Sequence, residues 1–114
     1  MREAFGLLSD ASDSAPESEL RVAIVVAGFP PPEVNEPIRT GGEIMHPDLS
    51  WHRLKVAIEY EGDHHRVDRS QWSRDIRRFR TFTDAGWSIY RATAHDYRAP
   101  HKLLLWLGRN LPAA

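Results

Sequence analysis

The strongest constraint on the fold is a strand, a helix and another strand that follow in order in the second half of the chain. The segment 54–61, LKVAIEYE, alternates apolar and polar side chains in the manner of a half-buried strand. Apolar residues then recur at helical spacing over 70–85, Gly86 ends that helix, and 87–93 predicts another strand. Two strands of one sheet that are joined by a helical crossover lie parallel, with a right-handed connection. The sequence therefore predicts an α/β fold.

Two earlier segments are expected to extend this sheet. The segment 33–39 is typical of a short edge strand, because Pro37 cannot donate a hydrogen bond to a neighbouring strand. Residues 40–42, Thr-Gly-Gly, predict a hairpin turn into a second strand over 43–51. Short turns would then join these two segments and 54–61 into an antiparallel meander.

Helices are predicted at both ends of this arrangement. Ser14 can cap a helix whose apolar residues recur at helical spacing, and Gly28 with the proline run after it ends that helix. Pro100 opens a last, leucine-rich helix. The predicted order is αβββαβα, a mixed central sheet flanked by helices, in a single domain over 14–114 that follows a flexible arm over 1–13.

Composition excludes several classes of protein. At 114 residues, of which 41% are hydrophobic, the chain has the size of one domain with one core. Because it contains no cysteine, neither a disulfide framework nor a cysteine-based zinc site is expected. It has no apolar run of about 18 residues and no secretory type of start, so we expect no membrane partner and a cytoplasmic location.

Charge is distributed unevenly along the chain. The formal net charge is −1, which argues against a strongly basic nucleic-acid binder. However, residues 66–80 hold six arginines against two aspartates, directly after an acidic stretch. Such a segment suits a phosphate backbone held beside a metal site, although a solvated helix face carries similar charges.

The acidic stretch 59–65, EYEGDHH, raises the question of what holds its like charges together. Glu59 and Glu61 are two apart on the predicted strand, so they share one face, about 6.5–7 Å apart at their Cα atoms. Asp48 comes close to them if the preceding strand pairs antiparallel. A splay or bulge is then needed, because positions 48 and 59 are not directly opposite in a tight hairpin. Three carboxylates would converge at one end of the sheet.

A hard cation is one explanation for this cluster. Like charges so close repel and raise one another's pKa unless a cation neutralises them. Oxygen ligands suit Mg²⁺, or Mn²⁺ in its place, which keeps waters for a phosphate substrate. The polar face of a half-exposed strand is an equally open alternative. His64 and His65 follow a turn at Gly62. They are interpreted either as a general acid or base, or as ordinary loop residues.

The combined pattern resembles a known family. It runs HPDLSW, then LKVAIEYEGDHHR, then QWSRDIRRFRTFTDAGWSIYRATAHD. It is similar to the small endonuclease-like domain common in actinobacterial proteins. That domain is related to the very short patch repair endonuclease, within the PD-(D/E)xK restriction-endonuclease-like superfamily. The resemblance covers about residues 15–111. It implies a restriction-endonuclease-like core and a metal-dependent DNA endonuclease that hydrolyses phosphodiester bonds.

The resemblance also implies roles for individual residues. Asp48 and Glu59 match the two acids that hold Mg²⁺, and Glu17 takes the place of a helical glutamate. Glu61 stands where the superfamily usually has a lysine that helps to activate water, so it is assigned as a further metal ligand or base. His65 is the implied general acid or base.

Other side chains are expected to contact DNA. These nucleic-acid-binding candidates are His64, Gln71, Arg74, Arg77 and Arg78. Lys55 shares the strand face of Glu59 but lies about 13 Å from it by strand rise, so it is a poor substitute for the missing lysine. The four tryptophans are expected in the core rather than stacked on bases.

Two other functions stay open. The missing lysine favours a nucleic-acid-binding or toxin–antitoxin-type module that has the same fold and weak or no catalysis. A purely structural domain with solvated acids is the third interpretation. Because 114 residues leave little room for a module that reads sequence, a homodimer or a partner domain is expected to supply specificity.

Overall fold

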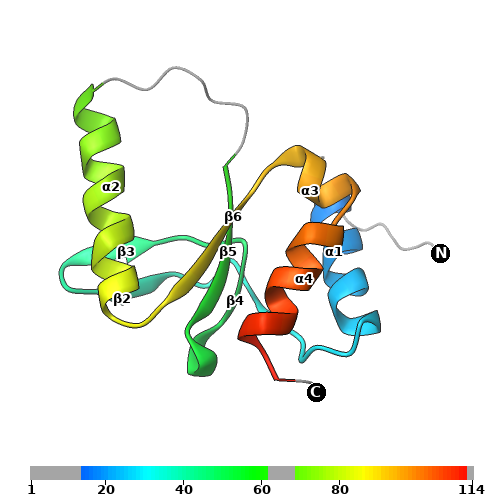
Figure 1. Ribbon diagram of the computed structural model, residues 1–114. Coiled ribbons are helices and arrows are strands. Elements are labelled where there is room, and N and C mark those ends of the chain that lie inside the picture. The colour runs from blue at the N-terminus through cyan, green and yellow to red at the C-terminus, as the bar shows by residue number, and fades with distance from the viewer. Residues whose placement is uncertain (1–13, 62–68, 113–114) are drawn as a thin grey trace.

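The computed structural model describes residues 14–61 and 69–112 and has a mixed α/β architecture (Figure 1). Its main sheet has four strands in the order β1-β4-β5-β6. These are β1 (Glu33–Val34), β4 (Leu49–Trp51), β5 (Val56–Tyr60) and β6 (Ser88–Ala92). The pairs β1/β4 and β4/β5 are antiparallel, whereas β5/β6 is parallel, so the sheet is mixed as predicted.

The predicted parallel pair is confirmed. Helix α2 (Arg69–Asp84) joins β5 to β6, and the register places Glu59 beside Arg91. Gly86 follows α2 with a φ of +99°, a conformation that glycine adopts without strain. The alternating apolar residues over 54–61 and the helical spacing over 70–85 therefore predicted this strand–helix–strand unit correctly.

The predicted meander is wrong, because both of its first strands are interrupted. Pro37 and Pro47 lie at the interruptions, where a residue without an N–H cannot continue a ladder of hydrogen bonds. The divided segments give β2 (Ile38–Thr40) and β3 (Glu43–Met45) in addition to β1 and β4. β2 and β3 form a separate two-stranded hairpin through the predicted glycine turn, while β1 pairs with β4.

A four-residue connection sets the register between β4 and β5. A 3₁₀ turn (His52–Leu54) is followed by Lys55 in the left-handed conformation, with a φ of +57°. The resulting register pairs Leu49 with Ile58, and Asp48 N then donates a hydrogen bond to the carbonyl oxygen of that same Ile58, 3.0 Å away. The departure from regular pairing that the sequence predicts near Asp48 is therefore present, since Asp48 and Leu49 both lie against Ile58.

Lys55 lies at the opposite end of β5 from the carboxylates. Its Nζ donates a hydrogen bond to the carbonyl oxygen of Ala85, 2.9 Å away, just after α2 ends. A cation is favoured there, because unpaired carbonyls give the end of a helix a partial negative charge. This placement agrees with the prediction that Lys55 does not replace the missing lysine.

The helices cover the two faces of the sheet (Figure 1). On one face lie α1 (Ser14–Val26), α3 (Ala94–Arg98) and α4 (His101–Asn110), and on the other lies α2. Strand β5 contributes to both cores, with Val56 and Ile58 on the side of the three helices and Ala57 on the side of α2. The buried members of the α2-side core are Ile38, Met45, Ala57, Phe82 and Trp87.

Helix α3 is an element that the sequence analysis does not predict. Thr93 Oγ1 accepts a hydrogen bond from Asp96 N at 3.4 Å, and Asp96 Oδ2 accepts one from Thr93 N at 2.9 Å. This reciprocal capping box satisfies two backbone donors and starts the helix. Tyr90 also donates to Asp96, and burial together with this carboxylate raises the pKa of Tyr90 to about 12.

The start of the first helix and the character of the described helices bear on the predictions. Helix α1 begins at Ser14, the predicted start, and the flexible arm predicted over 1–13 lies outside the described residues. None of the described helices is both long and apolar enough to cross a membrane.

Candidate functional site

A cleft of about 720 Å³ lies between α2 and the carboxyl ends of β5 and β6. The predicted site residues that line it are Glu59, Glu61, Gln71, Arg74 and Arg78. Its other described lining residues are Glu43, His46, Tyr60, Trp72, Asp75, Ile76 and Arg91. The cleft therefore combines acidic strand ends with an arginine-bearing face of a helix.

Glu59 is held by an arginine. Arg78 Nη1 lies 2.9 Å from Glu59 Oε2, and Arg78 Nη2 lies 3.5 Å from Glu59 Oε1. Both side chains are shielded from water, with 20% of Arg78 and 14% of Glu59 exposed. A two-point contact between a guanidinium and a carboxylate in such a place is stronger than a single surface ion pair.

Asp75 joins this pair to a second arginine. Arg78 Nη2 donates to Asp75 Oδ1 at 2.7 Å, and Arg91 Nη2 donates to Asp75 Oδ2 at 2.9 Å. Arg91 Nη2 also lies 3.5 Å from Glu61 Oε2. The five side chains form an alternating series, Glu59–Arg78–Asp75–Arg91–Glu61, which we call the charge array. The like charges at the end of β5 are thus neutralised by arginines of α2 and β6.

The charge array stabilises the ionised forms of its central members. Burial alone would raise the pKa of Asp75, but hydrogen bonds from Arg78 and Arg91 outweigh it and lower this pKa. Burial also disfavours the charge of Arg78, but hydrogen bonds to Glu59 and Asp75 outweigh it and raise the pKa of Arg78. Asp75 therefore stays ionised in mildly acidic solution.

We expect Asp75→Asn to lower the free energy of unfolding by about 1–2 kcal/mol at neutral pH, because two guanidinium groups lose a shared charged acceptor that is partly exposed. The pKa of Asp75 is lower in the folded than in the unfolded chain. Its stabilisation is therefore present above the ordinary pKa of 3.8 and is lost as the pH falls through the folded value. Urea unfolding of both proteins from neutral pH to about pH 2.5 should show a difference that shrinks toward acid. A difference that is the same at every pH would contradict this account.

Asp48 is held from the face that α1, α3 and α4 cover. Its Oδ2 accepts hydrogen bonds from Tyr60 N at 2.9 Å and from the Tyr97 hydroxyl at 3.2 Å. Tyr97 belongs to the core on that face, and its ring lies against that of Tyr60, with the centroids 5.1 Å apart. Burial, followed by the charges of Asp48 and Glu17, raises the pKa of Tyr97. Tyr97 therefore stays protonated and donates to Asp48, with Glu17 close enough to act on it.

The donor chemistry at this end of the sheet fits a magnesium ion. Asp48 directly precedes β4, Glu59 lies near the end of the neighbouring β5, and both offer carboxylate oxygens, the ligands that this ion prefers. Mg²⁺ keeps several waters and commonly binds through one or two protein carboxylates. Within residues 14–61 and 69–112, no three acidic or histidine side chains are grouped closely enough to hold a metal ion. The described residues therefore do not form a preassembled site of three such ligands.

Helix α2 presents part of the predicted DNA-binding set to the cleft. Gln71 and Arg74 line the cleft together with Arg78. Arg77 is exposed but is absent from the described lining. His64 and the predicted general acid or base, His65, lie outside the described residues.

The prediction that all four tryptophans lie in the core is wrong for Trp72. It is 58% exposed and lines the cleft. Trp51 and Trp87 are buried as predicted, and Trp106 is half-buried against the core under the three helices. Phe82, near the end of α2, is the buried side chain of that helix. Helical spacing predicts which face of a helix is apolar. It does not predict how much of the helix's length packs against the sheet.

Comparison with known proteins gives two relatives from Mycobacterium tuberculosis. They are the Uncharacterized protein MT2308 of strain CDC 1551 / Oshkosh and the Uncharacterized protein Rv2248 of strain ATCC 25618 / H37Rv. Each is 31% identical to this chain over 115 residues, which are 99% of the chain and 42% of the relative. The chain thus spans less than half the length of the curated relatives it matches. No protein-family model and no solved structure matches it.

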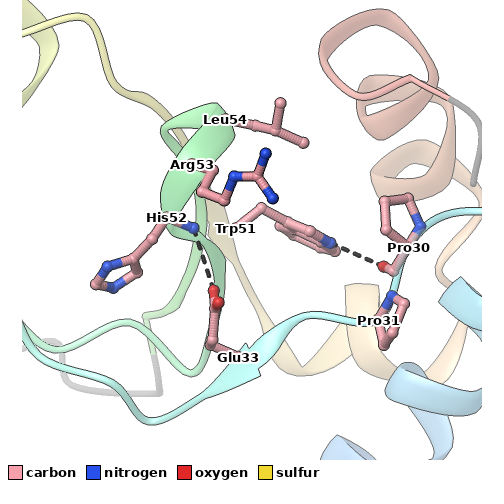
Figure 2. Close-up of a pocket in the computed structure, with 7 residues that line it drawn as sticks. All are labelled: Pro30, Pro31, Glu33, Trp51, His52, Arg53 and Leu54. Atoms are coloured by element: carbon pink, nitrogen blue, oxygen red, sulfur yellow. Dashed lines mark hydrogen bonds between the residues drawn. The ribbon is translucent and has the colours of Figure 1, made fainter.

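A second hollow, of about 390 Å³, lies near the start of β5. Figure 2 shows Trp51 directed at Pro30, whose carbonyl oxygen accepts a hydrogen bond from Trp51 Nε1 at 2.8 Å. Glu33 Oε1 accepts a hydrogen bond from His52 N at 3.1 Å (Figure 2). These contacts tie Pro30 to the end of β4, and Glu33 of β1 to the start of the turn that follows β4. None of the predicted site residues is among the described residues that line this hollow, so we interpret it as a structural junction.

Three side chains contribute to the site without a predicted role: Asp75, Arg91 and Tyr97. Asp75 lies three residues before Arg78, a spacing at which helical side chains meet. Arg91 lies beside Glu59 in the parallel register of β5 and β6. Each is the fourth residue of its strand, so counting residues from the start of the two strands would have identified Arg91. Tyr97 depends on α3, whose sequence signal is Thr93 followed three residues later by Asp96.

Proposed function

We propose that this chain is a cytoplasmic, metal-dependent DNA endonuclease domain with a restriction-endonuclease-like core. The observation that carries the proposal is the cleft beside Glu59, which α2 lines with arginine, at the end of β5 where the neighbouring strand β4 begins after Asp48. A mixed sheet with helices on both faces is compatible with such a core. The resemblance of the sequence to patch-repair-related endonucleases supports the same function.

The proposed metal is Mg²⁺, or Mn²⁺ in its place, held by Asp48 and Glu59 with Glu61 as a further ligand or base. When bound, such an ion lowers the pKa of a water and offsets the charge that develops at the phosphorus. Tyr97 and the backbone N–H of Tyr60 orient Asp48 by donating to its Oδ2. Hydrogen bonds of this kind hold a ligating carboxylate in place.

The proposed substrate is the phosphodiester backbone of DNA. Gln71, Arg74 and Arg78 face the cleft and supply hydrogen-bond donors and positive charge to phosphate groups. The family resemblance adds His65 as general acid or base and Glu17 as a further acid on the Asp48 side. Because the matched relatives are more than twice as long as the aligned part, we propose that a second copy or a partner domain selects the DNA sequence.

A nucleic-acid-binding or toxin–antitoxin-type module with weak or no catalysis is the second candidate. The charge array favours it, because Arg78 and Arg91 already neutralise Glu59 and Glu61. The position of the usual lysine is occupied by Glu61, and Lys55 is bound at the far end of the strand.

Nicking of supercoiled plasmid separates the two candidates. We expect the purified chain to nick plasmid in Mg²⁺ or Mn²⁺ and not in EDTA, and we expect folded Asp48→Ala to lose this activity. Plasmid binding without nicking in either metal would overturn the nuclease proposal and favour the binding module. Neither binding nor nicking would overturn both.

A further inference from the structure

We propose that Arg78 and the divalent metal ion compete for Glu59, so that the charge array sets the affinity of the site for metal. This inference rests on the proposed function, because it concerns the same carboxylate. Arg78 is then an internal counter-ion of Glu59 as well as a phosphate contact. Asp75 is the positioning residue that keeps Arg78 in place when the metal ion replaces it at Glu59.

Competition follows from the geometry of the pair. Each oxygen of Glu59 faces one Nη atom of Arg78, at 2.9 Å and 3.5 Å. A hard cation lies about 2.0–2.6 Å from a carboxylate oxygen, and a guanidinium that close to the ion would repel it. Cation binding therefore requires Arg78 to withdraw from at least one oxygen of Glu59.

Asp75 lowers the free-energy cost of that withdrawal. Its Oδ1 already accepts a hydrogen bond from Arg78 Nη2 at 2.7 Å, the shortest contact in the charge array. When Arg78 leaves Glu59, it keeps this charged partner, so no shielded positive charge is left uncompensated. Arg91, which donates to the other oxygen of Asp75, helps to hold that carboxylate in position.

The exchange also changes what Arg78 offers to a substrate. While Arg78 is paired with Glu59, the two charges cancel. Once a cation has replaced it there, its charge adds to that of Arg74 and to the amide of Gln71 on the α2 side of the cleft. Positive charge at that place favours a phosphate group, so metal binding and phosphate binding should strengthen each other.

Calorimetric titration with Mn²⁺, without DNA, tests the competition directly. We expect Arg78→Met to bind Mn²⁺ about 10-fold more tightly than the wild type, because a charged hydrogen-bonded partner no longer holds Glu59. Arg74→Met is the matched control. It removes the same charge from the same cleft, but Arg74 makes no ion pair with another described residue. Its through-space effect should stay within about 3-fold.

Arg78→Lys provides a second variant, since it keeps the charge and loses the two-point contact. Its Mn²⁺ affinity should lie between those of the wild type and Arg78→Met, and thermal melting shows that each variant is folded. If Arg78→Met binds Mn²⁺ no more tightly than Arg74→Met, the competition is overturned and the proposed nuclease function stands. If neither the wild type nor any variant binds Mn²⁺, the metal-dependent function falls together with the competition.

Discussion

Replacing Glu59 with glutamine is expected to lower the rate of Mg²⁺-dependent plasmid nicking by about 100-fold or more. Glutamine keeps the size of the side chain and an oxygen that can accept from Arg78, but it lacks the negative charge that a hard cation prefers. Changes in residues that only support metal ligands already cost about 10–100-fold, so loss of a charged ligand should reach at least the upper end of that range. The measurement is the initial rate at which supercoiled plasmid becomes open circle.

Glu43→Gln is the matched control for this experiment. Glu43 lines the same cleft from β3 but is not a member of the charge array. Its neutralisation should leave the nicking rate within about 3-fold, because solvent and salt screen a charge that does not touch the metal. Equal losses in Glu43→Gln and Glu59→Gln would mean that the general acidity of the cleft matters, and the assignment of Glu59 as a ligand would be wrong.

Replacing Phe82 with alanine is expected to lower the free energy of unfolding by about 3–5 kcal/mol. Phe82 has no exposed surface and packs edge to face against Trp87, with the ring centroids 6.5 Å apart. Its neighbours in the core belong to the sheet and to the β2–β3 hairpin, which cannot collapse around a cavity without losing their own pairing. Urea unfolding at neutral pH measures the difference.

Phe79→Ala, one turn earlier in α2, is the control for size and chemistry. Phe79 is half-buried, and its ring lies 5.7 Å from the guanidinium carbon of Arg91, so its loss should cost only about 1–2 kcal/mol. Since Phe82 anchors the helix that carries Arg78 and Asp75, its loss should also displace the charge array and slow nicking. If Phe82→Ala destabilises the protein no more than Phe79→Ala does, Phe82 is not the anchor of α2.

Elements that depend on neighbouring residues were predictable from the sequence. Alternation over 54–61, helical spacing over 70–85 and the glycine turn at 40–42 each constrain the backbone within a few residues, and the structure contains all three elements. The parallel pairing of β5 with β6 follows from the helical crossover between them.

Elements that depend on distant partners were predicted less well. Pro37 and Pro47 are visible in the sequence, but whether a proline bends a strand or ends it depends on which neighbour would have paired there. Trp72 has helical spacing with Phe82, yet α2 buries only the later of the two. The length over which a helix contacts a sheet is set by the whole packing arrangement.

The sequence by itself determined that Glu59 and Glu61 share one face at the end of a strand, with an arginine-rich helix after them. Only the tertiary structure decided that Arg78 and Arg91 neutralise these carboxylates through Asp75, and that Tyr97 orients Asp48 from the other face. An ion pair forms when packing brings two side chains within about 4 Å, whatever their separation along the chain. The packing of α2 on the sheet and of α3 beside α1 sets the distances between elements, whereas the contact of Asp75 with Arg78 is local, at i,i+3 spacing on α2.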